Sequence, residues 1–369
     1  MSKSILYLGG FELPDKNAAA QRVIANAKLL RGMGYEVSFM GISKDIANAP
    51  KAVDGFTSSP VPYPINVRQW IHQILSFVES EDLFDNNWEY VVLYNFPSIA
   101  SLRILNACHK RGIKVIHDLT EWESASGCTP RQVIRKLDIN LRMRYCMKWM
   151  DGVICISRYL YDYYKDYTNC ILIPPTIDLN DPKWNRDRML STGENVNLVY
   201  AGSAGFRGKD RLDSIIEALQ GKIGISLTVI GMTKEQYEQG YGKNVPESVL
   251  VEFRGRVPHM DAVKAVQEAD FQMLIRDSNL KNNAGFPTKF VESISCCTPV
   301  IATLTSNIDD YLKDGVNGFI VSSERPLSAL FSELSSLSKD KIVVMKQACR
   351  EFKGFDYRSF TTEFSKIFK

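Results

Sequence analysis

The segment 285–293, GFPTKFVES, has a proline, a lysine and a glutamate at the spacing of a helix start. Pro287 suits the first turn of a helix, where a missing N–H costs nothing, so the amides of Thr288 and Lys289 should point out of the helix N-terminus. A lysine in this turn opposes the helix dipole, whereas a bound phosphate reverses that effect. The pattern therefore predicts a phosphate site; the plainer alternative is a surface lysine on an ordinary capped helix.

Glu292 lies three residues after Lys289, so both side chains project from one face of the expected helix. An intrahelical ion pair is one explanation. The other is a carboxylate that accepts hydrogen bonds from two sugar hydroxyls beside the phosphate. A nucleotide has that arrangement of groups.

A second loop of the phosphate-binding kind is 200–210, YAGSAGFRGKD, which runs from a strand through three glycines into a helix. Glycines let the backbone approach a ligand closely, and Arg207 and Lys209 supply positive charge. The loop matches neither a Walker loop nor the Rossmann GxGxxG pattern, so a plain connecting loop is the alternative. Two strand–loop–helix junctions with cations at a helix start favour two phosphates of one diphosphate.

In the first half of the chain, Gly9 and Gly10 end the first expected strand, and His117 ends the fourth. A histidine at the carboxyl end of a parallel strand can face a ligand cleft, although a lone histidine is often structural, and both interpretations stay open. Glu121 and Glu123 resemble a metal-binding carboxylate pair, but no other ligand cluster accompanies them. We therefore expect no metal.

The segment 131–150 is strongly basic, with six Lys or Arg residues and one acid, Asp138. Apolar residues recur through it at helical spacing: Ile134, Leu137, Leu141, Tyr145 and Trp149. This pattern favours a helix whose apolar stripe faces the core and whose basic face is solvated. The alternative is a surface that attracts anionic lipid headgroups or a lipid-diphosphate substrate, and the two can hold together.

The chain has 369 residues, with 45 Lys and Arg against 42 Asp and Glu, so its formal net charge is +3. This near balance and the 45% hydrophobic content argue against disordered, collagen-like and low-complexity chains. The first apolar stretch, 5–8, is too short for a signal peptide, and no run reaches the roughly 18 apolar residues of a membrane-spanning helix. We expect a cytoplasmic protein, whose eight cysteines, without metal-ligand spacing, are reduced and packed.

Short apolar runs alternate with amphipathic stretches along the whole chain, which predicts an α/β protein with parallel sheets. The expected strands are 5–9, 36–41, 90–94, 114–117, 152–156 and 170–173, then 197–201, 227–230, 249–253, 272–275 and 300–302. The segment 174–182 holds three prolines and reads as a linker. We expect two Rossmann-like, doubly wound domains, 1–177 and 178–352, which face each other across a ligand cleft, and a C-terminal helix, 353–369.

A resemblance follows from several motifs that occur in order along the chain. They are the first-strand glycines with 31–37 (RGMGYEV), 151–157 (DGVICIS), 200–210, 253–257 (FRGRV), 285–292, 298–303 (TPVIAT) and 314–319 (DGVNGF). Together they resemble the GT-B fold glycosyltransferases, and among them the retaining family 4 enzymes, over nearly the full length. By this resemblance the first domain is the acceptor side, the second binds a nucleotide sugar, and the C-terminal helix packs back on the first domain.

The resemblance also implies roles for individual residues. Lys209, with Arg207 nearby, would bind the donor diphosphate, the Thr288 amide would hold its distal phosphate, and His117 would lie near the donor sugar. Glu292 would accept hydrogen bonds from the ribose. The expected donor-binding set is Gly9, Gly10, Gly202, Ser203, Arg256, Val257, Arg276, Asn283, Gly285, Phe286, Pro287, Thr288, Lys289 and Glu292.

One position departs from the family pattern. A glutamate that contacts the transferred sugar often stands eight positions before the second glutamate, and here that position is Ala284. Asn282, Asn283 or Arg276 could take over its role, which would imply a different sugar or pose.

The resulting expectation is an enzyme that moves a sugar from a nucleotide-diphosphate donor, with UDP or GDP favoured, to a sugar or lipid-linked acceptor. The expected configuration outcome is retention, the expected context is polysaccharide or glycolipid synthesis, and no cofactor or nucleic acid is implied. Peripheral membrane contact through 131–150 would place the protein at the inner face of the membrane. The alternatives are a nucleotide-sugar epimerase, a non-catalytic nucleotide-sugar-binding subunit and, least favoured because the fingerprint glycines are missing, a nicotinamide dehydrogenase.

Overall fold

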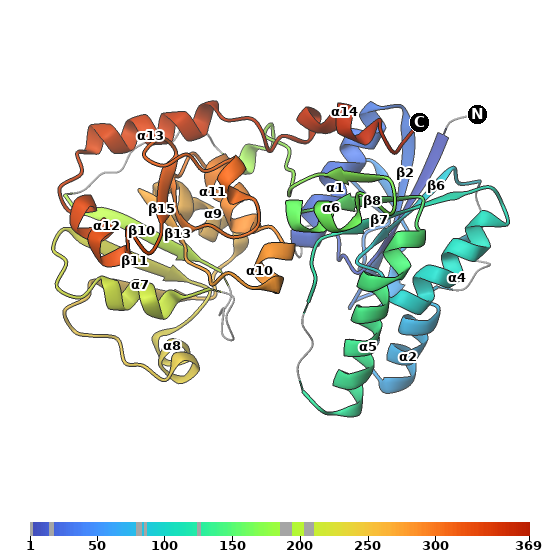
Figure 1. Ribbon diagram of the computed structural model, residues 1–369, viewed down its shortest axis with the longest axis horizontal. Helices are drawn as coiled ribbons and strands as arrows, with labels where there is room; N and C mark the ends of the chain where they lie inside the picture. Colours follow the sequence, from blue (N-terminus) through green and yellow to red (C-terminus); the bar gives the residue numbers. More distant parts are fainter. Residues whose placement is uncertain are drawn as a thin grey trace. The chain divides into compact units, whose positions relative to one another are not determined.

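The computed structural model describes residues 3–14, 18–78, 83–84, 87–123, 127–184, 194–202 and 210–369. The chain divides into two compact units (Figure 1). Unit 1 comprises Met1–Asp178, Ala284–Phe286 and Asp356–Lys369, and unit 2 comprises Leu179–Asn283 and Pro287–Phe355. Unit 1 is therefore built from segments that are far apart in the sequence.

The sheet of unit 1 has the strand order β3-β4-β2-β1-β6-β7-β8-β9, with β5 paired to β2. Its strands are β1 (Lys3–Gly9), β2 (Tyr35–Ser43), β3 (Ala52–Val53), β4 (Phe56–Ser58), β5 (Val61–Pro62), β6 (Tyr90–Tyr94), β7 (Lys114–Leu119), β8 (Gly152–Cys155) and β9 (Cys170–Leu172). The described pairs are parallel except β3 with β4. Every residue of β6 is buried, as expected of a strand covered on both faces.

The helices of unit 1 are α1 (Ala18–Gly32), α2 (Val67–Leu75), α4 (Ser98–His109), α5 (Pro130–Arg144), α6 (Arg158–Tyr164) and the short helices η1 (Cys146–Trp149), η4 (Tyr357–Phe360) and α14 (Thr361–Phe364). One face of the sheet packs against α1, through Val23, Ala27 and Leu30. Phe364 and Phe368, from the end of the chain, complete the same core. The ring of Phe368 lies 5.1 Å from that of Tyr90 on β6.

Helix α5 packs against the rest of unit 1 with the side that the sequence analysis assigned to solvent. Its apolar stripe is exposed, and Leu137 in the middle of the stripe keeps 65% of its surface in solvent. Ile139 and Met143 are buried instead, together with the guanidinium of Arg142, which donates to the carbonyl of Asn95 at 2.8 Å. The expectation of a core-facing stripe is thus wrong, because a single buried arginine anchors the face that the charge pattern assigned to solvent.

Unit 2 holds a second sheet with the order β12-β11-β10-β13-β14-β15, parallel throughout. Its strands are β10 (Val196–Ala201), β11 (Ile225–Ile230), β12 (Val251–Gly255), β13 (Phe271–Leu274), β14 (Val300–Thr303) and β15 (Gly318–Val321). Its helices are η2 (Pro182–Trp184), α7 (Leu212–Ala218), α8 (Lys234–Tyr241), α9 (His259–Glu268), α10 (Leu280–Ala284), α11 (Thr288–Ser295), η3 (Ile308–Asp310), α12 (Leu327–Leu334) and α13 (Lys339–Glu351). The predicted α/β class is confirmed, and each predicted strand is present with its ends within two residues.

All eight cysteines are free thiols, and six of them are buried, whereas Cys128 is exposed. Within the described ranges, no helix combines the length and the apolar character that crossing a bilayer requires.

Candidate functional site

The candidate site lies at the switch point of the second sheet, where the chain stops adding strands on one side of β10 and starts adding them on the other. Strands β10 and β13 are neighbours, and the chain continues from β10 to β11 on one side and from β13 to β14 on the other. Ligands of open parallel sheets bind outside the carboxyl ends of the strands at such a switch point. Gly202 directly follows β10, and Arg276 follows β13 by two residues. The fold therefore brings these two expected site residues to one place.

Asp210 is the carboxylate at this switch point. Its Oδ1 lies 2.7 Å from Nε of Arg276, and its Oδ2 lies 2.5 Å from Nζ of Lys289. The hydroxyl of Tyr200, the next-to-last residue of β10, donates to the same Oδ2 at 2.9 Å. The lysine ammonium also lies 4.2 Å from the centre of the Tyr200 ring. One carboxylate thus gathers two cations and a phenol from three separate segments.

The charge of Asp210 is set by these neighbours. The carboxylate is 2% exposed, and burial alone favours the protonated form. The charges of Lys289 and Arg276 outweigh burial and hold the pKa of Asp210 well below its usual range. Burial and the nearby carboxylate together raise the pKa of Tyr200 far above that of a free phenol. The group is therefore a carboxylate, two cations and a neutral phenol at physiological pH.

Helix α11 starts beside this group. Pro287 is its N-cap residue and not, as had been expected, part of its first turn. Thr288 is thus the first helical residue, and Lys289 lies in the first turn. The described start has no side-chain hydrogen bond at the cap and no acid in the first turn, so no fixed negative charge of the helix itself offsets the dipole there. Lys289 therefore lies at a helix N-terminus, as predicted, and such a terminus suits an anion.

Gly202 is required by the path of the lysine side chain. A Cβ atom at this position would collide with Nζ and Cε of Lys289. The glycine therefore leaves room for the ammonium to reach Asp210.

The remaining expected donor residues of unit 2 lie on other elements. Arg256 is exposed and Val257 half-buried, directly after β12, which lies two strands from β10. The amide of Asn283 donates to Oγ of Ser278 at 3.0 Å, and its oxygen accepts from the amide of Ser306 at 3.1 Å. The side chain of Asn283 thus links the segments that follow β13 and β14.

Glu292 is half-buried on α11, one turn after Lys289. Gly285 and Phe286 precede the helix and group with unit 1, where Phe286 is buried. Ala284 is fully buried, and its carbonyl accepts a hydrogen bond of 2.7 Å from the hydroxyl of Ser157. Position 284 therefore contributes a backbone contact to the fold.

Three of the expected site residues, Ser203, Arg207 and Lys209, lie outside the described residues.

In unit 1, His117 does not lie on an accessible surface as expected. Its side chain is fully buried, and Nε2 accepts a hydrogen bond from the amide of Phe96 at 3.2 Å. Burial, with a smaller effect of the charge of Arg142, lowers the pKa of His117 to about 3, so the imidazole is neutral. In the folded protein His117 thus accepts from the backbone at the carboxyl end of β7, and its expected contact with the donor sugar stays a prediction.

Gly9 and Gly10 end β1, as predicted, but they differ in their surroundings. A Cβ atom on Gly9 would lie 2.5 Å from the carbonyl oxygen of Tyr94 on the paired strand, and the φ of Gly9 is 154°. Gly10 is exposed, with open space at the position of a Cβ. Close strand packing explains Gly9 without a ligand.

Two charged groups were not singled out from the sequence. One is Asp210, which only the pairing of three distant segments reveals. The other is Asp118, directly after His117, whose carboxylate lies 2.8 Å from Nη2 of Arg22 and accepts a hydrogen bond from Tyr7. Both carboxylates end up beside cations at the carboxyl ends of strands, and the only sequence signal was an acid placed just after a strand or at the end of a loop.

The carboxylate of Glu123 forms an ion pair with Arg135. No group of three or more His, Cys, Asp or Glu side chains is placed to hold a metal ion in the part of the chain that the structure describes.

Comparison with known proteins gives matches in both units. Residues 195–340 match the family described as glycosyl transferases group 1. An uncharacterized glycosyltransferase of Methanocaldococcus jannaschii is 22% identical over 324 residues, which cover 76% of this chain and 83% of that protein.

Solved structures match over almost the whole chain. HepE of Anabaena, in complex with UDP and glucose, superposes with a TM-score of 0.63 at 14% identity and covers 99% of this chain and 98% of its own. Sucrose-phosphate synthase of Thermosynechococcus elongatus has a TM-score of 0.69 at 14% identity with the same coverage. The two parallel-sheet units thus have the GT-B fold of these structures, and the similarity to the glycosyl transferases of group 1 extends over residues 195–340.

Proposed function

We propose that this protein transfers a sugar from a nucleotide-diphosphate sugar to an acceptor hydroxyl, with retention of configuration, in the synthesis of a polysaccharide or glycolipid. The observation that carries the proposal is the position of Arg276 and Lys289, two cations on one carboxylate at the switch point beside the start of α11. A diphosphate fits such a place, because cations and a helix N-terminus both favour it. The UDP-glucose complex of Anabaena HepE supports a nucleoside diphosphate such as UDP or GDP.

In the proposed reaction, the bond between the anomeric carbon and the diphosphate oxygen breaks. The acceptor oxygen bonds to the same carbon, and the acceptor proton passes to the oxygen of the departing diphosphate. Negative charge builds up on the departing diphosphate, so cations that face it stabilise the transition state. We assign this role to Lys209 and Arg207, with the Thr288 amide and Lys289 at the distal phosphate.

The other donor contacts follow from the positions of the remaining residues in unit 2. Glu292, one turn along α11 from Lys289, is placed to accept hydrogen bonds from ribose hydroxyls. Val257 and Arg256 follow β12, whose carboxyl end is the proposed location of the base.

A second candidate function is a non-catalytic nucleotide-sugar-binding subunit. It is favoured by Ala284, whose side chain cannot contact sugar hydroxyls as a glutamate would, and whose backbone is engaged by Ser157. The two candidates share the donor site and differ only in turnover.

The first test is nucleotide binding, measured by thermal shift and calorimetry with UDP, GDP, ADP, CMP, dTDP and their common sugar conjugates. A nucleotide at a hundred times its dissociation constant adds about 2.7 kcal/mol of stability. Lys289→Met and Glu292→Ala should each lose this effect, whereas Lys264→Met, which changes an exposed lysine on α9, should keep it. Wild-type protein without a shift for any nucleotide would contradict the proposal.

The second test separates the enzyme from the binding subunit. Lys209→Ala should lower turnover by two or more orders of magnitude, about 3 kcal/mol of transition-state stabilisation. Nucleotide binding without sugar transfer to any member of a broad acceptor panel would favour the subunit.

We also propose that unit 1 contacts a membrane through an exposed surface on two helices, the α2–α5 surface. Helices α2 and α5 lie side by side (Figure 1), with the guanidinium of Arg131 5.0 Å from the centre of the Trp70 ring. The exposed apolar side chains of this surface are Ile65, Val67, Ile71, Val133, Ile134, Leu137 and Leu141. Arg68, Arg131 and Lys136 are exposed beside them.

Exposed apolar side chains with cations on the same helices can insert into the interface of an anionic bilayer. Each nearby Lys or Arg adds about 1 kcal/mol of attraction to such a surface. We expect co-sedimentation with vesicles of phosphatidylcholine and phosphatidylglycerol, but weak binding to phosphatidylcholine alone. Leu137→Glu should weaken it, whereas Ile223→Glu, at an equally apolar exposed position of unit 2, should not. Equal binding by both variants would contradict the proposed contact.

A further inference from the structure

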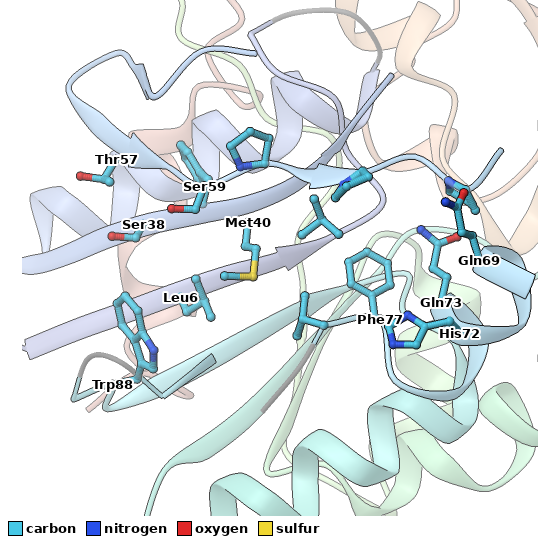
Figure 2. Close-up of a pocket in the computed structure, with 16 residues that line it drawn as sticks. Leu6, Ser38, Met40, Thr57, Ser59, Gln69, His72, Gln73, Phe77 and Trp88 are labelled. Atoms are coloured by element: carbon cyan, nitrogen blue, oxygen red, sulfur yellow. The ribbon is translucent and has the colours of Figure 1, made fainter. Parts of the chain in front are cut away.

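Unit 1 contains a groove of about 570 Å³ that the proposed donor site does not use. We call it the β2 groove; it is lined by Leu6, Ser38, Phe39, Met40, Thr57, Ser59, Pro60, Val61, Pro62, Pro64, Gln69, His72, Gln73, Phe77, Val78 and Trp88 (Figure 2). Its volume is typical of small-ligand sites, which measure roughly 300–1,000 Å³. The groove lies along the sheet rather than at the ends of the strands.

The sequence builds the two sides of the groove from simple periodicities. Side chains alternate along a strand, so Ser38 and Met40 of β2 project from the same face of the sheet. Gln69 and Gln73 are four residues apart on α2 and share one face of that helix. Asn66 fixes the start of α2, because its side chain accepts a hydrogen bond from the Gln69 amide. Sheet and helix thereby line one space.

Polar groups stand at both ends of the groove with an apolar middle. Figure 2 shows one end with Ser38, Thr57, Ser59 and Trp88, and the other with Gln69, His72, Gln73 and Phe77. Leu6 and Met40 lie between the two ends. An elongated ligand would therefore meet hydrogen-bonding groups at its ends and aliphatic or aromatic carbon along its length.

The charge of the lining narrows the class of ligand. Among the described residues that line this groove, none is Asp, Glu, Lys or Arg. A phosphate, a carboxylate or a nucleotide would lose its hydration there without an opposite charge in return. The described lining therefore favours an uncharged ligand over a charged one.

The hydrogen-bonding groups argue further against a plain hydrocarbon chain. Ser38 and Gln73 are half-buried, and neither side chain has a hydrogen-bond partner among the described residues. A hydrocarbon would leave the hydroxyl and the amide without partners, at a cost of about 1–3 kcal/mol each if fully desolvated. A sugar ring offers hydroxyls at its edge and C–H groups on its faces, so it satisfies both kinds of lining.

We infer that the β2 groove binds an uncharged saccharide. Resting on the proposed function, this saccharide is the part of the acceptor that lies away from the hydroxyl to which the sugar is transferred. The groove would then select the acceptor through neutral contacts, while the donor is held by charge.

The test starts with the full-length protein on an array of neutral oligosaccharides, followed by calorimetry with the sugar retained best. Ser38→Leu fills the groove and Gln73→Ala removes an amide, and each should weaken saccharide binding at least tenfold. Lys110→Ala, at an exposed position of unit 1 outside the groove, should leave it unchanged. Circular dichroism shows whether each variant is folded.

Two results would overturn the inference: no neutral saccharide retained, or equal affinity in the folded groove variants and wild type. Binding of n-decanol with no saccharide retained would assign the groove to an apolar chain instead. UDP binding, measured on the same samples, keeps the two proposals separate. Saccharide binding without any nucleotide binding would sustain the groove and remove the proposed transferase function.

Discussion

The ammonium of Lys289 lies 2.5 Å from the carboxylate of Asp210 and reaches it across the space that Gly202 leaves open. These residues come from the start of α11, the segment before α7 and the end of β10. Because the ion pair is buried at its acidic end, it fixes where the positive charge stands. The position of a proposed phosphate ligand thus depends on a residue that need not touch the phosphate.

Gly202→Ala tests that positioning directly. The new methyl group would occupy the place of Nζ and Cε of Lys289, and the flexible side chain would have to move. We expect UDP affinity to fall at least tenfold and the free energy of unfolding to fall by about 1–3 kcal/mol, because the lysine has to leave the buried carboxylate and the backbone at this position does not suit a side chain. Calorimetry and urea unfolding measure the two quantities. Gly32→Ala, at a position with open space around it, is the control; unchanged UDP affinity in Gly202→Ala would separate Lys289 from the nucleotide.

Removal of the carboxylate itself should destabilise unit 2. Asp210→Ala leaves two largely buried cations without their shared partner, which costs about 3–5 kcal/mol. Asp277→Ala removes the exposed partner of Arg211, and exposed pairs contribute about 0–1 kcal/mol. Urea unfolding of the two variants measures this difference. Similar losses in both would show that the buried cluster adds little to folding.

His117 should make the protein sensitive to mild acid. The unfolded chain takes up a proton at this residue near pH 6.5, whereas in the folded protein the pKa is lowered to about 3. Its contribution to stability is therefore complete above pH 6.5. It is lost by about 1.4 kcal/mol per pH unit as the pH falls from 6.5 towards 3.

The measurement is the free energy of unfolding of wild type and His117→Gln between pH 7 and pH 4. The glutamine side chain stays neutral, so this part of the pH dependence should disappear. His109→Gln, at a half-exposed histidine, serves as the control. Parallel curves for wild type and His117→Gln would contradict the buried neutral imidazole.

The end of the chain should stabilise unit 1. Phe368 is 2% exposed and packs against Tyr90 and Phe364, so Phe368→Ala should cost about 3–5 kcal/mol. Deletion of 356–369 should destabilise unit 1 further and leave UDP binding to unit 2 in place. Val344→Ala, at an exposed position of α13, should change stability by no more than about 0.5 kcal/mol. An unfolding curve for Phe368→Ala that matches wild type would contradict the role of this ring.

Most strands of the two sheets were predictable because they contain a short, largely apolar run. β6, with the sequence YVVLY, is buried at every position, and such a run has few other ways to fold. The short strands β3, β4, β5 and β15 and helix α2 were missed. Their runs are only two or three residues long, or half-exposed, so they carry little periodicity.

The site was predictable only in part, for a different reason. Lys289 could be predicted from its place at a helix start, which is a local feature, whereas Arg276 was expected only as a possible replacement for the glutamate missing at position 284. Asp210 could not be predicted, because its role depends on two residues 66 and 79 positions further along the chain. Helix α5 shows the same limit. The exposed apolar stripe around Leu137 has the same spacing as a buried stripe, and only the elements packed against the helix determine which side is buried.

The discontinuity of unit 1 determines the order in which the two cores can form as the chain leaves the ribosome. Unit 2 has all of its residues once Phe355 has been added, but unit 1 still lacks Phe364 and Phe368 at that moment. Domains made during synthesis generally fold as units when their chain is complete. Unit 1 is therefore the last to complete its core. Until then, the apolar side chains that Phe364 and Phe368 cover, such as Tyr35 and Tyr90, stay accessible.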